Sequence, residues 1–288
     1  MLPFLPRDVS PDLIKAVQGG DLIPLVGAGV SRQTNPPFPT WSELLALMMR
    51  LALDKRCITR TRARELRQLL QEDVLLGAES LRSSLVDGGE YDDFIRRTFD
   101  PPLVRPAEIH TALFDLNAQI ILTTNYDKML EDACASKYRR MPVVYTYNES
   151  ELVLPSLKYR DRPTIFKIHG DVGKRDSIIL SERDYRTLIY EKAKYRQVLS
   201  SLLTTRTMLM IGFSFSDPEL ERMFEMLAHV LEYQGPLHYI YLPKGQISNV
   251  KAQMWKSMNR IEVIPFKMSD GSELLTFINH LSNRAKNP

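Results

Sequence analysis

Short apolar runs rich in β-branched residues recur along this chain of 288 residues, and stretches with helical periodicity lie between them. Runs of this kind are typical of parallel strands buried on both faces, because the connecting helices cover both sides of the sheet. The pattern therefore predicts an α/β protein with a parallel sheet. We expect six such strands, over residues 22–26, 119–123, 164–168, 208–211, 238–242 and 261–264.

A long helical segment interrupts this alternation after the first strand. Residues 40–105 are rich in Leu, Arg and Glu and contain no run that reads as a strand. Thr40 and Glu43 have the spacing of a capping box, which marks the start of a helix. We predict a Rossmann-like, doubly wound sheet in a single domain over residues 1–288, with its core at about 1–39 and 106–288 and a helical insertion at about 40–105.

The composition excludes several classes of protein. Hydrophobic residues make up 44% of the chain and charged residues 25%, as in globular proteins. The 38 Lys and Arg residues exceed the 35 Asp and Glu residues by only three, which is too mild an excess for a nucleic-acid protein. We therefore expect no direct binding of nucleic acid.

Metal and membrane sites are not expected either. Cys57 and Cys134 lie far apart and form no CxxC pair, which excludes a four-cysteine zinc ribbon, and no other residues show metal-ligand spacing. No apolar run approaches the ~20 residues that span a bilayer. The first six residues contain two prolines and lack the basic start of a signal peptide, so we expect a cytoplasmic protein.

Gly27-Ala28-Gly29-Val30-Ser31 follows the first expected strand. Its small residues allow a tight turn in which the backbone approaches a pyrophosphate and points amide groups at it. The alternative is an ordinary glycine-rich turn between a strand and a helix. The dinucleotide pattern G-x-G-x-x-G is not met, because Arg32 stands at its last glycine position, and the chain has no phosphate-binding G-x-x-x-x-G-K-[ST].

Three further polar motifs follow expected strands. Thr124 and Asn125 precede Asp127, so a side-chain amide and a carboxylate stand together; the alternative is that they cap the next helix. His169 with a flexible glycine behind it is well placed to act as a general base, although a lone histidine is more often structural. Gly212 permits close approach, and Ser214 offers a donor to a ribose or phosphate oxygen. Because ligands of open α/β sheets bind beyond the carboxyl ends of the strands, we expect these motifs to form one site.

These motifs, in this order, resemble the sirtuin-like (silent information regulator type) superfamily from about residue 20 to 218. The segment 27–31 is similar to the family's phosphate-binding GAG-x-S. Residues 124–127 are similar to its Q-N-x-D, with Thr124 in place of the glutamine. His169-Gly170 is similar to its catalytic His-Gly, and 212–214 to its G-[TS]-S ribose loop.

Two departures separate the chain from the protein-deacylating members of that superfamily. The four-cysteine zinc module is absent, and the G-I-P-D-F-R segment is replaced by residues 33–39, QTNPPFP. The variants around Asn125, His169, Tyr185 and Gly212 look like the bacterial antiphage-defence branch, whose members hydrolyse NAD to nicotinamide and ADP-ribose and so deplete the infected cell. The resemblance therefore implies an NAD hydrolase that acts in abortive infection.

The resemblance also implies roles for individual residues. His169 would be the base acting on the ribose or on water, Asn125 would position either of these, and Asp127 would hold the carboxamide or ribose. No acid is needed on the leaving group, because nicotinamide leaves a cationic glycoside as a neutral molecule. The residues implied to bind NAD are Gly27, Ala28, Gly29, Ser31, Thr124, Gly212 and Ser214.

Stand-alone relatives of about this size form ring complexes with a HerA-like hexameric DNA-translocating ATPase. The resemblance thus implies a homo-oligomer whose activity is gated by assembly or by such a partner. Two alternatives stay open. One is a scaffold that binds NAD or ADP-ribose without turnover, and the other is an NAD-dependent protein deacylase or ADP-ribosyltransferase. Release of nicotinamide together with free ADP-ribose, without an acyl-peptide, distinguishes the hydrolase from both.

Overall fold

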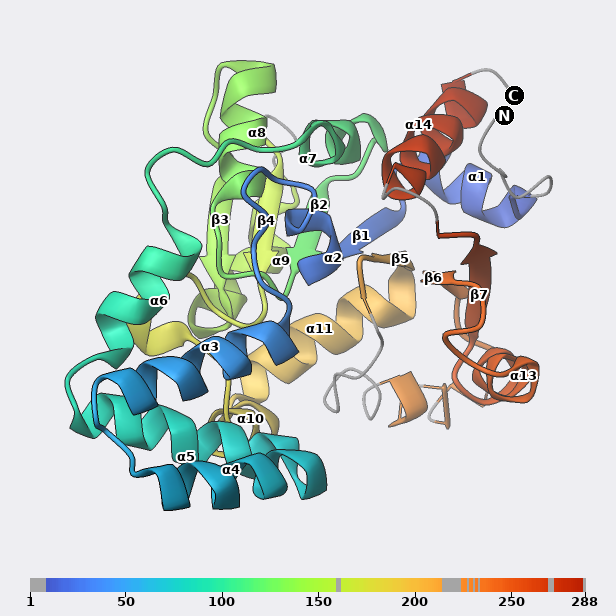
Figure 1. Ribbon diagram of the computed structural model, residues 1–288. Helices are drawn as coiled ribbons and strands as arrows, with labels where there is room; N and C mark the ends of the chain where they lie inside the picture. Colours follow the sequence, from blue (N-terminus) through green and yellow to red (C-terminus); the bar gives the residue numbers. More distant parts are fainter. Residues whose placement is uncertain are drawn as a thin grey trace.

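A computed structural model describes residues 9–158, 162–213, 224–226, 228–229, 231–232, 234–268 and 272–286. Seven parallel strands form one sheet in the order β3-β4-β2-β1-β5-β6-β7 (Figure 1). The chain thus has the predicted α/β, Rossmann-like fold. The strands are β1 (Leu22–Val26), β2 (Ile120–Thr123), β3 (Val143–Thr146), β4 (Thr164–Lys167), β5 (Thr207–Ile211), β6 (His238–Pro243) and β7 (Ile261–Phe266).

The six strands expected from the sequence are all present, and the sheet has one more. The additional strand, β3, lies at the edge of the sheet, where β4 is its one partner among the described residues. Successive strands fill one side of β1 first and then the other, so the strand order reverses between β1 and β5. Ligands of doubly wound sheets bind at such a reversal, beyond the carboxyl ends of the strands.

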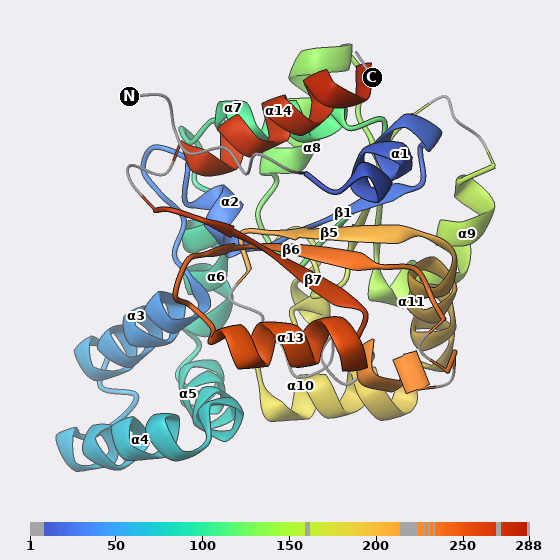
Figure 2. The same ribbon diagram turned by 90° about the vertical axis from the view of Figure 1, so that its right-hand side faces the viewer.

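Helices cover both faces of the sheet, and alternate strand residues pack against each layer (Figure 2). In β1, Leu22 and Val26 face one layer, whereas Ile23 and Leu25 face the other. The first layer contains α1 (Pro11–Gly19), α7 (Glu108–Ala112), α8 (Met129–Tyr138) and α14 (Glu273–Lys286). The second contains α11 (Ala193–Thr205) and α13 (Asn249–Met258).

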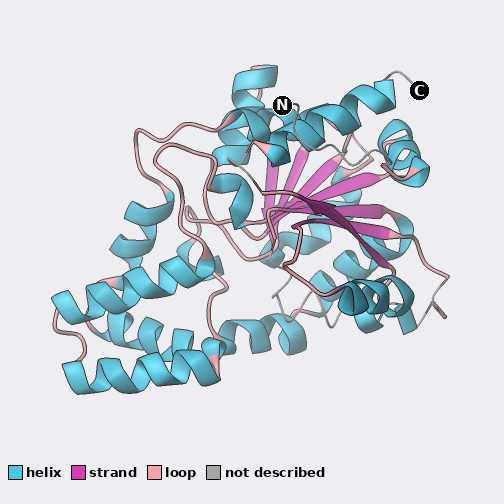
Figure 3. Ribbon diagram, turned by 45° about the vertical axis from the view of Figure 1, so that its right-hand side comes forward, coloured by secondary structure: helices cyan, strands magenta, loops and turns pink. Residues whose placement is uncertain are grey.

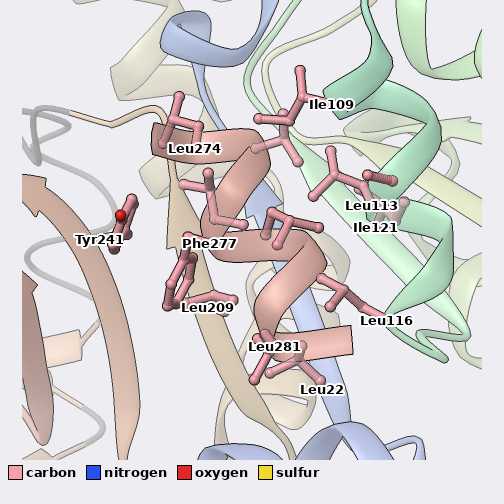
Figure 4. Close-up of a cluster of buried hydrophobic side chains, with 14 of the residues drawn as sticks. Leu22, Ile109, Leu113, Leu116, Ile121, Leu209, Tyr241, Leu274, Phe277 and Leu281 are labelled. Carbon is pink, nitrogen blue, oxygen red and sulfur yellow. The ribbon is translucent and has the colours of Figure 1, made fainter. Parts of the chain in front are cut away.

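The C-terminal helix α14 packs into the first layer through a row of apolar side chains (Figure 4). Phe277 stacks on the ring of Tyr241 from β6, with 4.1 Å between ring centroids and 9° between ring planes. On the helix's other side, Ile109 comes from α7 and Leu113 from the 3-10 helix η1 (Leu113–Asp115). This packing holds the start of α14 close to the carboxyl end of β6.

Of the helices between β1 and β2, four lie within the segment 40–105 that the sequence assigns to an insertion (Figure 3). Their apolar cluster also includes Tyr126, Val172 and Leu180, which follow β2 and β4. The helical segment therefore packs on loops at the carboxyl ends of the strands. The division of the chain into a core and an insertion stays a prediction. The helices are α3 (Trp41–Asp54), α4 (Arg60–Glu72), α5 (Val74–Asp87) and α6 (Tyr91–Phe99).

The capping box predicted at Thr40 is confirmed, since the Thr40 hydroxyl accepts a hydrogen bond from the backbone of Glu43 and the Glu43 carboxylate accepts one from the backbone of Thr40. In the described parts of the chain, no helix is long and apolar enough to cross a membrane. Shorter helices complete the connections: α2 (Ala28–Ser31), η1 (Leu113–Asp115), η2 (Tyr147–Leu152), α9 (Val153–Ser156), η3 (Arg175–Ser177), α10 (Glu182–Arg186) and the π-helix η4 (Thr187–Glu191).

Candidate active site

A cleft of about 450 Å³ lies at the carboxyl ends of the strands. The loops after β1, β2, β4 and β5 form its polar side, and residues of α3, α5 and α10 contribute to its walls. Every predicted site residue that the structure describes lines this cleft, whereas Ser214 lies outside the described residues. The residues brought together are Gly27, Ala28, Gly29, Ser31, Thr124, Asn125, Asp127, His169 and Gly212.

Gly27, Gly29 and Gly212 pack backbone against backbone. A Cβ atom on Gly27 would lie 2.6 Å from the carbonyl oxygen of Gly212, and one on Gly29 would lie 2.8 Å from its Cα. The N–H of Gly27 donates to the carbonyl of Ile211, and the N–H of Gly29 donates to that of Gly212, each over 2.9 Å. The N–H groups of these two glycines are thus used inside the protein and are not the anion donors expected from the sequence. The two glycines instead allow the loops after β1 and β5 to touch.

Asn125 links the loop after β2 to the loop after β1. Its side-chain Nδ2 donates to the carbonyl of Gly27 over 3.1 Å and to the Ser31 hydroxyl over 2.9 Å. Its backbone N–H donates to the hydroxyl of Thr123 over 3.0 Å. Both amide N–H groups of the side chain are occupied, so Oδ1 is the atom left to bind a ligand or a water molecule in the cleft.

His169 follows β4 after one intervening residue, Ile168, and is 5% exposed at the cleft. The ring of Tyr185, from α10, meets the imidazole edge-on, with 5.4 Å between centroids and 85° between planes. The carbonyl of His169 accepts a hydrogen bond from the N–H of Ile179 over 2.9 Å. Behind it, Gly170 adopts φ +95°, and a Cβ there would lie 1.9 Å from the carbonyl oxygen of Ser177. Tyr185 therefore packs against the imidazole, and close packing around Gly170 holds the backbone that carries it.

Asp127 is buried at the cleft, and its Oδ1 accepts a hydrogen bond from the N–H of Met129 at the start of α8. Asp127 thus binds the backbone at the start of α8, although Lys128 is the N-cap residue, and its carboxylate also lines the cleft. His110 of α7 is a neighbour: burial lowers the pKa of its imidazole, and the Asp127 carboxylate opposes that shift. His110 therefore stays neutral beside the site at neutral pH.

Aromatic side chains form an apolar wall of the cleft. Phe38 and Phe99 stack with 6.2 Å between centroids, and Tyr126 meets Phe99 edge-on at 5.1 Å. Trp41 of α3 lines the same wall. At the cleft, Arg32 forms an ion pair with the Glu43 carboxylate. This aromatic wall could not be predicted from the sequence, because its residues come from separate segments that only the fold brings together.

Sequence reasoning also missed Lys167, the last residue of β4, which is fully buried between the carboxylates of Glu131 and Asp171. The sequence feature that could have indicated this residue is a charge at the end of an otherwise apolar strand. Among the residues described by the structure, no three His, Cys, Asp or Glu side chains form a group able to hold a metal ion.

Comparison with known proteins adds independent information. The model of a family described as "SIR2-like domain" matches residues 119–264. NAD(+) hydrolase ThsA of Bacillus cereus is 29% identical over 155 residues, 54% of this chain and 30% of that protein. The ThsA protein of Enterococcus faecium is 30% identical over 139 residues, which are 48% of this chain and 28% of that one.

Defense-associated sirtuin 2 of Bacillus subtilis is 25% identical over 112 residues, covering 38% of this chain and 10% of that protein. The chain thus matches less than a third of the length of these curated relatives. The family model, in contrast, extends from the start of β2 to β7 and includes Asn125, His169 and Gly212. Because that model matches half of the chain, this protein belongs to the SIR2-like domain family.

Proposed function

We propose that this protein is an NAD⁺ glycohydrolase, which cleaves NAD⁺ to nicotinamide and ADP-ribose. The observation that carries the proposal is the convergence of Asn125 and His169, from two strand ends, on the cleft that also contains Gly27 and Gly212. Relatives that bear the name NAD(+) hydrolase support it. NAD is the substrate in this proposal, and no metal ion takes part.

The chemistry makes modest demands on the protein. Nicotinamide leaves as a neutral molecule from a cationic N-glycoside, so its departure needs no protonation. The bond breaks through a transition state with oxocarbenium character, as in other glycoside cleavages. The protein has to orient the ribose, place a water molecule and accept one proton, while the surrounding walls limit the access of other water.

Each of these tasks has a candidate residue. His169, held against Tyr185, is the base that accepts a proton from the ribose or from water. Asn125 presents Oδ1 to the water or ribose, because Gly27 and Ser31 occupy its N–H groups. Asp127 holds the carboxamide or the ribose. In this proposal Gly27, Ala28, Gly29, Ser31, Thr124, Gly212 and Ser214 bind the rest of NAD.

The name of the relative Defense-associated sirtuin 2 supports a role in defence. We extend the proposal accordingly: the protein works in the cytoplasm and depletes NAD during antiphage defence, by abortive infection. Its activity is gated by homo-oligomerisation or by a HerA-like hexameric ATPase. Particle masses measured alone and with such an ATPase, beside NAD turnover in both states, test the gating.

The test of the activity follows nicotinamide and ADP-ribose by chromatography after incubation with NAD. We expect equal amounts of both products, and a loss of at least ~100-fold in His169→Ala, as for removal of a general base. Asn125→Ala is expected to lose activity as well. His280→Ala and Asn279→Ala, on α14 and outside the cleft, are the matched controls. NAD binding without nicotinamide release would instead indicate a scaffold, and full activity in both cleft variants would refute the assigned roles.

A further inference from the structure

Lys167 ends β4 with its side chain fully buried, on the side of the sheet that α8 covers. Its Nζ lies 2.6 Å from the carbonyl oxygen of Asp127 and 3.3 Å from that of Tyr126. It also lies 2.6 Å from Oδ2 of Asp171 and 2.8 Å from Oε1 of Glu131. Four oxygen atoms from two loops and one helix therefore surround a single ammonium group.

Such a group has to be charged to hold these oxygen atoms together. Burial alone lowers the pKa of Lys167, but the carboxylates of Glu131 and Asp171 outweigh this effect and raise it above its usual value. Burial raises the pKa of Glu131, whose second oxygen, Oε2, is buried without a hydrogen-bond partner among the described residues. Buried charges of this kind are retained only where they are paired and hydrogen-bonded.

The two loops that Lys167 joins carry the proposed catalytic residues. The loop after β2 carries Asn125 into the cleft, and the loop after β4 carries His169. The loops have further links, because the N–H of Val172 donates to the carbonyl of Tyr126 over 3.0 Å. Lys167 itself does not line the cleft, so it can act on a ligand only through these loops.

Asp171 extends the connection into the second loop. Its Oδ1 accepts a hydrogen bond from the N–H of Gly173 over 2.6 Å, and its backbone N–H donates to the Ser177 hydroxyl over 2.9 Å. The Asp171 carboxylate is thus anchored on its own loop while its other oxygen binds Lys167. Lys167 thereby bridges the backbone that follows Asn125 and the segment that follows His169.

We infer that Lys167, with Asp171 and Glu131, is a positioning residue that fixes the loop of Asn125 relative to the loop of His169 for cleavage of NAD. The inference rests on the proposed function, which it deepens. An apolar side chain of similar volume would fill the core but would leave the two carbonyl groups and both carboxylates without their shared donor. The loops would then settle at a different spacing, and displacement of reacting groups by about 1 Å can cost 100-fold in rate.

The test has to separate positioning from stability. Lys167→Met alone leaves two buried carboxylates unpaired, so the deciding variant is the triple Lys167→Met, Glu131→Gln, Asp171→Asn, in which no charge stays unpaired. We expect its melting temperature to remain close to that of the wild type. Its kcat for nicotinamide release is expected to fall 10- to 100-fold, with KM changed less than threefold. The control is Lys174→Met, on the same loop, whose ion pair with Glu149 is exposed.

A stable triple variant with the kcat of the wild type would overturn the inference. Should the triple variant not fold, Asp171→Asn decides in the same way, because it keeps Lys167 paired with Glu131 but removes the charge of Asp171. An amide has one acceptor oxygen, so it cannot accept from both Lys167 and Gly173 as the carboxylate does. Amide hydrogen exchange at Val172 and Met129 provides a readout that is independent of turnover. Faster exchange in the variant supports the bridge, and unchanged protection contradicts it. An inactive wild type would refute the proposed hydrolase, while the exchange result would still decide the role of Lys167.

Discussion

Asn125 donates a hydrogen bond from Nδ2 to the Ser31 hydroxyl over 2.9 Å, which joins two loops that lie 94 residues apart in the sequence. The same nitrogen donates to the carbonyl of Gly27. The orientation of the Asn125 side chain therefore depends on the loop after β1. A residue assigned to NAD binding from a motif is, in the folded protein, also a partner of the proposed catalytic amide.

This contact predicts the effect of Ser31→Ala. Asn125 would keep its bond to Gly27 and lose the other, so its Oδ1 would be less well oriented. We expect kcat/KM for NAD to fall about tenfold, which corresponds to about 1.4 kcal/mol of transition-state stabilisation, with little change in melting temperature. Ser201→Ala is the control, because that hydroxyl is exposed on α11 and bonds only within its helix. Equal kcat/KM in Ser31→Ala and wild type would contradict the role given to this hydrogen bond.

Gly170→Ala tests the packing behind His169. Gly170 has φ +95°, and an added Cβ would overlap the carbonyl of Ser177 at 1.9 Å. Gly89 has a similar left-handed conformation, φ +71°, with open space around its Cα. Urea titration should therefore show a cost of about 1 kcal/mol for Gly89→Ala and at least ~3 kcal/mol for Gly170→Ala. Equal costs would mean that the loop around Gly170 relaxes freely.

Six strands and the four polar motifs could be predicted from the sequence because the signals are local. Each strand is a continuous apolar run, and each motif follows one directly. The edge strand β3 was missed because Val143, Val144 and Tyr145 are only half-buried and pair with one neighbour, so their sequence lacks the pattern of a central strand.

The tertiary contacts of the motif residues could not be predicted from the sequence in the same way. Lys167 and Glu131 are 36 positions apart, and their contact exists only because α8 packs over β4. Tyr185 lies against His169 because the chain returns to the sheet after a loop. Such contacts depend on the tertiary arrangement. The sequence shows a lysine at the end of an apolar strand, but it does not show which residues surround it.

The ion pair between Arg82 of α5 and Asp184 of α10 makes a further prediction. Asp184 also accepts hydrogen bonds from the backbone N–H groups of Leu180 and Ser181, and the adjacent Tyr185 packs against His169. Arg82→Met should lower stability by about 2 kcal/mol, since the pair is largely buried, and should reduce kcat three- to tenfold.

The matched control for Arg82 is Arg62→Met, which removes an exposed ion pair with Glu65. It should change stability by less than about 0.5 kcal/mol and leave kcat unaltered. Chemical denaturation and steady-state kinetics on the same preparations measure both effects. If Arg82→Met lost stability without any change in kcat, the ion pair between α5 and α10 would have no influence on catalysis in the cleft.

His238 predicts how stability depends on pH. Burial, with a smaller contribution from Arg260, lowers the pKa of this histidine to about 3, and its Nδ1 accepts a hydrogen bond from the N–H of Met208. The unfolded chain binds a proton near pH 6.5 and the folded protein does not, so stability falls as the pH drops below 6.5. This residue should account for a loss of about 2 kcal/mol between pH 7 and pH 5.

Denaturation of wild type and His238→Asn at both pH values tests this prediction. Asparagine keeps an acceptor near the position of Nδ1 but does not titrate, so the variant should lose less stability on acidification by about that amount. His110 is unchanged in the comparison and contributes in the same direction, because burial lowers its pKa too. Parallel losses in the two proteins would exclude His238 as the source.

The central claim is that the cleft between Asn125 and His169 hydrolyses NAD. The most direct measurement incubates wild type and His169→Ala with NAD alone, without any acyl-peptide, and quantifies nicotinamide and ADP-ribose over time. We predict equimolar products from the wild type and a rate at least ~100-fold lower in the variant. If the wild type binds NAD yet releases no nicotinamide, alone or with an ATPase of the kind proposed as its partner, this cleft is not a hydrolase active site.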